Sequence, residues 1–197
     1  MVKTRILRVV ELLADGATRR TLEEAALHLR MCLEYVVLIS FTSHRSVWEA
    51  ADRELAKADA DAARKKLRRL NPSYWSQPVR MADGVLEDLE EGYLTESEWG
   101  RAFGTVSELL HAQNPFAMHD VEKSFASLAE IAQKLLNLTD AFMITLADSG
   151  LAFLCHVNYD RAQAAPKVLI MLGQDKWPET FTLAVSMARA KSDGSAD

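Results

Sequence analysis

The spacing of apolar residues changes once along this chain, near residue 138, and this change most constrains its fold. Before it, apolar residues recur every three or four positions, which is typical of amphipathic helices. After it, Phe142 and Ile144 alternate with other residues before Asp148-Ser149-Gly150, and the alternation resumes from Leu151. Alternation on both sides of a turn signal predicts a β-hairpin. We therefore expect an α+β domain that is mostly helical, with a small antiparallel sheet near its C-terminal end.

Helices are expected where a capping residue precedes a run of apolar residues at helical spacing. Thr21 with Glu24, and Thr95 with Glu98, each have the spacing of a capping box at the start of a helix. The predicted helices cover residues 3–14, 21–41, 45–70 (as one helix or a pair), 95–112 and 120–138. The second of these carries few charges and is expected to be apolar on all faces and central to the core. Residues 71–94 contain prolines, glycines and an acidic stretch, so we predict an irregular connection there.

The sheet is expected to extend beyond the hairpin. Val168, Ile170 and Leu172 alternate and predict a third strand, and residues 181–187 form either a fourth strand or a helix. The predicted parts of the chain are a single α+β domain over 1–191, helical in 1–138 and β in 139–191, and a disordered tail over 192–197.

The composition limits the kinds of partner that we expect the protein to bind and indicates its cellular compartment. The 197 residues carry a formal net charge of −5, which argues against nucleic-acid binding through bulk electrostatics but leaves room for a local basic patch. Cys32 and Cys155 lie far apart in apolar runs, so a structural disulfide is not expected. Charges interrupt the apolar positions of the first residues, unlike a signal peptide, and no apolar run approaches the ~18 residues of a membrane span. We expect a cytoplasmic protein without a membrane partner.

Three ionisable residues stand out in apolar surroundings. Arg30 and Glu34 are i,i+4 neighbours within the predicted helix 21–41. They form either a structural ion pair that fixes helix packing or a site in which Glu34 orients Arg30. His111 lies near the end of the predicted helix 95–112, just before Asn114-Pro115. It either interacts with the last carbonyls of that helix or serves as a general acid and base.

Other motifs give weaker signals. His28 and Cys32 are i,i+4 neighbours that could hold a metal in principle, but no second ligand cluster accompanies them. Ser43-His44 lacks a nucleophile elbow, and the chain has no Gly-rich phosphate loop. We therefore predict no metal site and no cofactor.

Three segments together resemble bacterial proteins of the HEPN-like helical superfamily, over roughly residues 20–118. These segments are LHLRMCLEYVVL, RRLNPSYW and TESEWGRAFGTVSELLHAQNPF. The resemblance implies a helical bundle that often dimerises, and many members are metal-independent ribonucleases of toxin–antitoxin or phage-defence systems. By resemblance, Arg30 and Glu34 match the Arg and Glu of the early helix, and His111 matches the His of the later one.

The chain departs from the family at one position. Active members carry an Arg shortly before the matching His, whereas here that stretch offers Thr105, Ser107 and Glu108, and the nearest arginine is Arg101. Arg30 is the alternative cation, supplied from the neighbouring helix. Whether the chain is a metal-independent endoribonuclease, with His111 as acid and base, Arg30 as phosphate clamp and Glu34 orienting Arg30, is left open by the sequence.

A basic run predicts where RNA would bind. The run Arg64-Lys65-Lys66-Leu67-Arg68-Arg69 is the densest in the chain, and Tyr74 and Trp75 follow it. Such a run can track phosphates while aromatic rings stack on bases. It can equally be a solvated helix face, in which Asp61 pairs with Lys65.

Two alternatives to an RNA-directed protein remain. In the first, the chain is a non-catalytic, homodimeric protein-interaction module, with an antitoxin or another protein as its partner, and the same residues only stabilise packing. In the second, the opening RILRVVELLADGATRRTLEEAALHLRM begins a winged-helix DNA-binding regulator. The second requires a turn and a polar recognition helix to follow, but the apolar stretch from Cys32 to Phe41 stands there instead.

Overall fold

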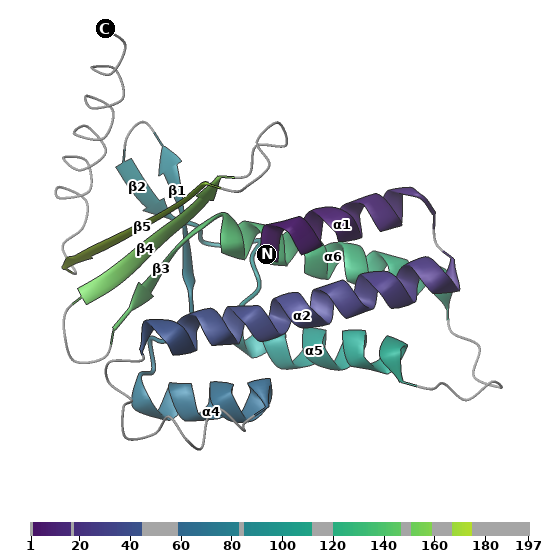
Figure 1. Ribbon diagram of the computed structural model, residues 1–197, viewed down its shortest axis with the longest axis horizontal. Coiled ribbons are helices and arrows are strands. Elements are labelled where there is room, and N and C mark those ends of the chain that lie inside the picture. The colour runs from purple at the N-terminus through teal and green to yellow at the C-terminus, as the bar shows by residue number, and fades with distance from the viewer. Residues whose placement is uncertain are drawn as a thin grey trace, which may run out of the picture.

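A bundle of helices with an antiparallel sheet at one end makes up the fold (Figure 1). The computed structural model of the protein describes residues 2–16, 18–44, 59–82, 85–111, 120–146, 151–158 and 167–174. Its helices are α1 (Val2–Ala14), α2 (Arg19–Ser43), α4 (Ala60–Leu70), α5 (Glu96–Leu110) and α6 (Val121–Asp140). Its strands are β1 (Gln77–Ala82), β2 (Val85–Asp88), β3 (Ala141–Thr145), β4 (Leu151–Asn158) and β5 (Lys167–Gln174). A mostly helical α+β fold is therefore confirmed.

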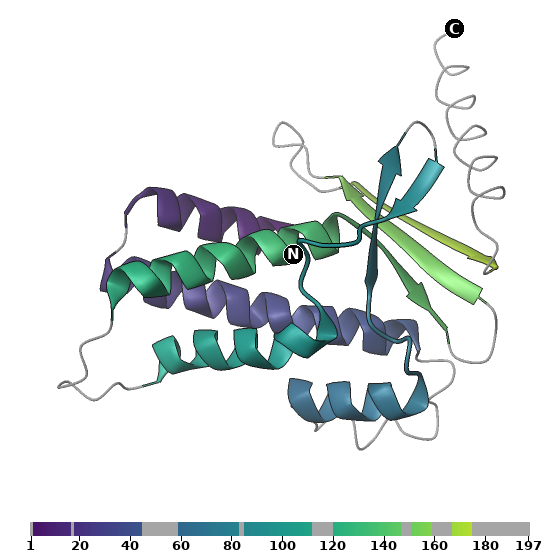
Figure 2. The same ribbon diagram turned by 180° about the vertical axis from the view of Figure 1, so that it is seen from behind.

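Helix α2 is the central helix of the bundle. It packs against α1, α4, α5 and α6, and both views show it running the length of the bundle (Figures 1 and 2). Its buried side chains are Leu22, Ala25, Ala26, Leu29, Cys32, Leu33, Val36, Val37 and Ser40. The predicted central position of this helix is confirmed, although Leu27 and Leu38 are 49% and 46% exposed, so its outer face is not buried.

The length and hydropathy of α2 bear on the expectation that no apolar stretch is long enough to span a membrane. Among the described residues, α2 alone is long and apolar enough to qualify as a candidate membrane span, with a mean hydropathy of 1.4 over 18 residues. The sequence-based expectation that no stretch approaches this length is wrong in that sense. Because its apolar side chains pack against four neighbouring helices, we interpret α2 as the core helix of the bundle.

The helix starts show what capping patterns predict and what they miss. Helix α5 begins with the predicted box, in which the Thr95 hydroxyl accepts from the Glu98 N–H and the Glu98 carboxylate accepts from the Thr95 N–H. Helix α2 instead begins one turn before Thr21. Its N-cap is Thr18, and Thr21 supplies the reciprocal bond as the third helical residue. The predicted box from Thr21 to Glu24 is therefore wrong, although the helix itself is confirmed.

The segment 71–94 is not an irregular connection. It contains the hairpin β1–β2, and β1 also pairs with β3 through Gln77↔Met143 and Pro78↔Phe142. The strand order is β2-β1-β3-β4-β5, with every neighbouring pair antiparallel. The sheet is thus built from the middle of the chain as well as from its C-terminal part.

The predicted C-terminal strands are confirmed where the structure describes them. Strands β3 and β4 pair in one register from Ala141↔His156 to Thr145↔Ala152, and β5 supplies the predicted third strand. Phe142 and Ile144 are buried, as their alternation predicts. The predicted helical segment 45–58, the strand or helix at 181–187 and the tail 192–197 lie outside the described residues.

Candidate functional site

Arg30 and Glu34 form the predicted ion pair on α2. The Arg30 Nε lies 3.3 Å from the Glu34 Oε1, and the two side chains are 34% and 41% exposed. The pair results from the i,i+4 spacing on a face of α2 that borders α5. Because both side chains reach solvent, neither is sealed in the core, and Arg30 retains access to a ligand.

Arg30 also contacts α5. Its guanidinium carbon lies 5.0 Å from the centroid of the Phe103 ring, and its Nη1 lies 3.5 Å from the Ser107 Oγ. The Ser107 hydroxyl itself donates to the Phe103 carbonyl oxygen at 2.6 Å. Three contacts therefore hold Arg30 where α2 packs against α5. We call this set of residues, Arg30, Glu34, Phe103 and Ser107, the α2–α5 seam. A cation held in this way is pre-organised for a phosphate.

His111 lies at the C-terminal end of α5, one turn beyond Ser107. Its backbone N–H donates to the Ser107 carbonyl oxygen at 3.1 Å, and its backbone leaves the helical region with ψ of 150°. The residue is exposed. His111 is thus the C-cap of α5, whereas an interaction of its imidazole with the last carbonyls of the helix stays a prediction. Within the described part of the chain, no contact joins His111 to Arg30, so the structure brings the two onto one helix pair without placing them together.

The basic run on α4 divides into a buried arginine and exposed cations. The Arg64 side chain is only 15% exposed, and it donates to Glu96 at 2.9 Å and to Asp61 at 3.1 Å. Its guanidinium carbon also lies 5.3 Å from the Trp99 ring centroid. Lys65, by contrast, is 63% exposed and pairs with Asp61, as predicted. Hydrogen bonds from Lys65 and Arg64 lower the pKa of Asp61. Arg64 is thus largely buried and already paired, which favours a structural role over the predicted contact with RNA.

The remaining cations of the run differ in exposure. Arg68 is 67% exposed, with its Nη1 3.8 Å from Glu96, and Arg69 is exposed as well. Lys66 is partly buried and takes part in an interaction of its own. Lys65, Arg68 and Arg69 are therefore the residues of the run that face solvent.

Of the two aromatic residues after the run, Tyr74 cannot offer the predicted stacking face, and for Trp75 that role stays a prediction. Tyr74 is fully buried, and this burial raises the pKa of its hydroxyl. Trp75 is half-buried, and its indole N–H donates to the Leu94 carbonyl oxygen at 3.1 Å. Tyr74 belongs to the hydrophobic core, and Trp75 packs against that core.

The residues that sequence reasoning missed are aromatic side chains of α5. Phe103 stacks on Trp99 with ring centroids 4.8 Å apart, and the Trp99 indole N–H donates to the Leu33 carbonyl oxygen. Arg30 caps this stack on the Phe103 side and Arg64 on the Trp99 side. The i,i+4 spacing of Trp99 and Phe103 was the available signal.

His28 and Cys32, the pair considered as possible metal ligands, each contact other groups of the protein. His28 Nδ1 lies 3.0 Å from the Arg5 Nη1, and Cys32 is buried with its Sγ 3.7 Å from the Val2 carbonyl oxygen. Burial raises the pKa of Cys32 to about 12. Both cysteines are free. In the described ranges, no group of three or more His, Cys, Asp or Glu side chains is arranged to hold a metal ion.

Comparison of the chain with protein-family models, with curated proteins and with solved structures finds no match. The site must therefore be interpreted from its own chemistry.

Proposed function

We propose that this chain is a HEPN-like cytoplasmic protein that binds RNA through the α2–α5 seam. The observation that carries the proposal is the placement of Arg30, whose guanidinium is fixed by Glu34, Phe103 and Ser107 yet remains about one third exposed. A positioned, partly exposed guanidinium matches the geometry of a phosphate group. The net charge of −5 requires RNA binding to be local rather than diffuse.

Exposed cations on α4 extend the proposed surface. Lys65, Arg68 and Arg69 face solvent on a helix that packs against α2, and Arg64 anchors that helix to α5. In this proposal the three exposed residues contact phosphates beyond the one bound by Arg30. Phosphate contacts of this kind fix position on the RNA without reading its sequence.

Cleavage would need His111 and Arg30 to act on the same phosphate. In that mechanism His111 removes the proton of the RNA 2′-hydroxyl, whose oxygen attacks the adjacent phosphorus, and Arg30, oriented by Glu34, stabilises the charge that develops on the phosphorane. The bond from phosphorus to the 5′-oxygen then breaks, and protonated His111 returns the proton to that leaving oxygen. Arg30 contacts Ser107, which lies one helical turn before His111 on α5, and this arrangement supports the pairing. A role in a toxin–antitoxin or phage-defence module follows from the HEPN resemblance and belongs to this proposal.

The test measures binding of a labelled single-stranded RNA by fluorescence anisotropy over a series of salt concentrations. Arg30→Ala should weaken binding by about tenfold or more and flatten the salt dependence by about one unit of log–log slope. Arg80→Ala is the matched control, since Arg80 is an exposed arginine paired with Glu87 on the β1–β2 hairpin. Equal effects of the two variants would contradict the proposed site.

A second assay follows RNA cleavage without added metal. Loss of cleavage in both Arg30→Ala and His111→Ala, with His28→Ala unaffected, would establish a ribonuclease at the α2–α5 seam. Tight binding without cleavage would leave the RNA-binding role and remove the enzymatic one. Circular dichroism of each variant checks that the fold is retained.

The outer face of α2 favours a second candidate function. Leu27 and Leu38 are about half exposed, and their separation of three helical turns places them on one face. We propose, as the alternative, a non-catalytic protein-interaction module in which this face meets a second copy of the chain or an antitoxin-like partner. Light scattering after size exclusion tests the homodimer. Leu27→Glu with Leu38→Glu should convert a dimer to a monomer, whereas Leu70→Glu, at an equally exposed site on α4, should not.

A further inference from the structure

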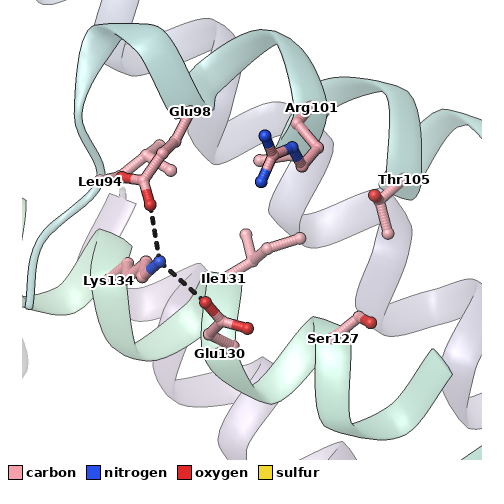
Figure 3. A pocket seen from close by; sticks show the side chains of 9 residues that line it. Leu94, Glu98, Arg101, Thr105, Ser127, Glu130, Ile131 and Lys134 are labelled. Atoms are coloured by element: carbon pink, nitrogen blue, oxygen red, sulfur yellow. Dashed lines mark hydrogen bonds and ion pairs between the residues drawn. The ribbon is translucent and has the colours of Figure 1, made fainter. Parts of the chain in front are cut away.

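A pocket lies between α5 and α6, on a different side of α5 from the α2–α5 seam (Figure 3). Its volume is about 150 Å³. The space exists because small side chains face each other across the helix pair, with Ala102 and Thr105 on α5 and Ser127 on α6. Leu94, Ala102 and Ile131 give it an apolar wall. The volume is below the ~300 Å³ at the small end of drug-sized sites, so any ligand must be small.

One end of the pocket is closed by a satisfied ion network. Lys134 Nζ lies 2.8 Å from the Glu98 Oε1 and 2.8 Å from the Glu130 Oε1 (Figure 3). The second Glu98 oxygen accepts from the N–H and hydroxyl of Thr95. These bonds, with Lys134 as the largest cause, hold the pKa of Glu98 at about 2. The Lys134 ammonium therefore already pairs with two carboxylates, and the Glu98 carboxylate stays negative at neutral pH.

Arg101 is a positively charged side chain that lines the pocket and takes no part in this ion network. It stands one turn after Glu98 on α5, where an ion pair would normally form. Arg101 is exposed, and within the described part of the chain it has no ion pair or hydrogen bond, whereas the Glu98 oxygens accept from Lys134 and Thr95. Figure 3 shows its guanidinium on the pocket side of α5, above Ile131, with no dashed line to it. The Thr105 hydroxyl, at the other end, likewise has no partner among the described residues.

We propose that this pocket binds a small organic monocarboxylate with a short apolar body. The Arg101 guanidinium provides two parallel N–H donors for the carboxylate, and the Thr105 hydroxyl donates a third bond. Leu94, Ala102 and Ile131 contact the apolar body of the ligand. Glu98 and Glu130 repel a second negative charge, so a phosphate dianion is excluded. A free acid and the C-terminal carboxylate of a peptide share this chemistry, and the small volume favours the free acid.

The experiment is a titration of the isotope-labelled protein followed by amide chemical shifts. The probes are isovalerate, its neutral amide isovaleramide, inorganic phosphate, and an acetylated dipeptide that ends in a free carboxylate. We expect isovalerate to shift amides of α5 and α6 near the pocket and to bind more tightly than the other three probes. Equal or tighter binding of isovaleramide or phosphate would overturn the proposal, and tighter binding of the dipeptide would overturn the free acid as the source of the carboxylate.

Two variants test separately whether binding requires the charge of Arg101 and the open volume of the pocket. Arg101→Gln should weaken isovalerate binding by about tenfold or more, because it removes a charge-assisted pair at an exposed position. Ala102→Leu fills the pocket without changing its charge and should also abolish the shifts. Arg80→Gln, which removes the same charge on β1, is the control. Isovalerate affinity that survives Arg101→Gln in folded protein would overturn the proposal. This site is independent of the α2–α5 seam, so its failure would leave the proposed RNA binding standing.

Discussion

The guanidinium of Arg64 on α4 lies over the indole of Trp99 on α5, with 5.3 Å between the guanidinium carbon and the ring centroid. Trp99 in turn stacks on Phe103, and Arg30 of α2 lies over the far side of this stack. Arginines from two helices thus enclose a pair of aromatic rings from a third. Cation–π contacts stabilise such an arrangement, more strongly for the largely buried Arg64 than for the partly exposed Arg30. The stack therefore connects the structural part of the basic run to the candidate RNA site.

Arg64→Ala should destabilise the protein, whereas Arg68→Ala should not. Removal of Arg64 leaves Glu96, itself only 18% exposed, without its closest cation and uncovers the Trp99 ring. We expect a loss of about 2 kcal/mol in the free energy of unfolding. Arg68, which is 67% exposed, should change stability by less than about 0.5 kcal/mol and affect RNA binding instead. Urea unfolding of both variants measures the difference, and a similar loss in each would show that Arg64 is not structural.

Periodicity predicted the helices and the C-terminal strands because these elements bury one face of a regular pattern. Hairpin β1–β2 escaped prediction because residues 77–82 include Pro78 and show no clear alternation. Only Gln77 and Pro78 of β1 pair with β3, so this strand is held to the sheet by a tertiary contact that a local pattern does not contain. The start of α2 was misplaced because Thr18 and Thr21 both have capping chemistry, and only the three-dimensional bonds identify Thr18 as the N-cap.

The contacts of the candidate site could likewise be predicted only where local sequence spacing determines them. The i,i+4 pairing of Arg30 with Glu34 follows from spacing alone and was predicted, but its contact with Phe103 depends on how α2 and α5 pack. The role of Arg64 was missed although a signal was present. Ala63 and Leu67 are the buried residues of α4, and Arg64 borders that face, while Arg68 and Arg69 lie further round the helix. The positions of the apolar residues around the helix, considered together with those of the charged residues, therefore distinguish the buried arginine from the exposed ones.

Glu98 predicts a loss of stability in acid. Its pKa is lowered from about 4.5 to about 2 in the folded protein, chiefly by the bond from Lys134. The stabilisation is therefore complete above pH 4.5 and is lost as the pH falls toward 2, because the unfolded chain takes up the proton first. Glu98→Gln keeps an acceptor for the Thr95 N–H but removes the titration. The free energy of unfolding should fall less steeply with decreasing pH in this variant than in the wild type, and parallel curves would contradict the assignment.

His28 predicts a second pH effect, nearer neutrality. Burial, and then the charge of Arg5, lower its pKa below the ordinary value of 6.5. The unfolded chain therefore binds a proton at a higher pH than the folded protein does, and stability decreases as the pH falls below 6.5. The difference in unfolding free energy between wild type and His28→Gln should shrink between pH 7.5 and pH 5.5. A difference that is constant over this range would show that His28 does not titrate differently in the two states.

Asn71 joins the bundle to the sheet, and its removal should cost more stability than removal of a comparable surface amide. The Asn71 amide donates to the His44 Nε2 at 2.8 Å and to the Thr145 carbonyl oxygen at 2.7 Å. Since Nε2 accepts, the His44 proton is on Nδ1, which donates to the Ser40 carbonyl oxygen. His44 is 1% exposed, so in Asn71→Ala no water replaces the lost donor.

We expect Asn71→Ala to lower the free energy of unfolding by about 3 kcal/mol, because it leaves the buried His44 Nε2 and the partly buried Thr145 carbonyl oxygen without their donor. Asn137→Ala is the matched control. Its amide also donates to a backbone carbonyl, that of Gly92 at 2.7 Å, but this bond is exposed. Water can replace it, so the expected loss is under about 1 kcal/mol. Chemical unfolding of the two variants under one set of conditions compares the costs. Equal losses would mean that burial around His44 does not set the strength of this connection, and that helix α2 and strand β3 are held together by apolar packing alone.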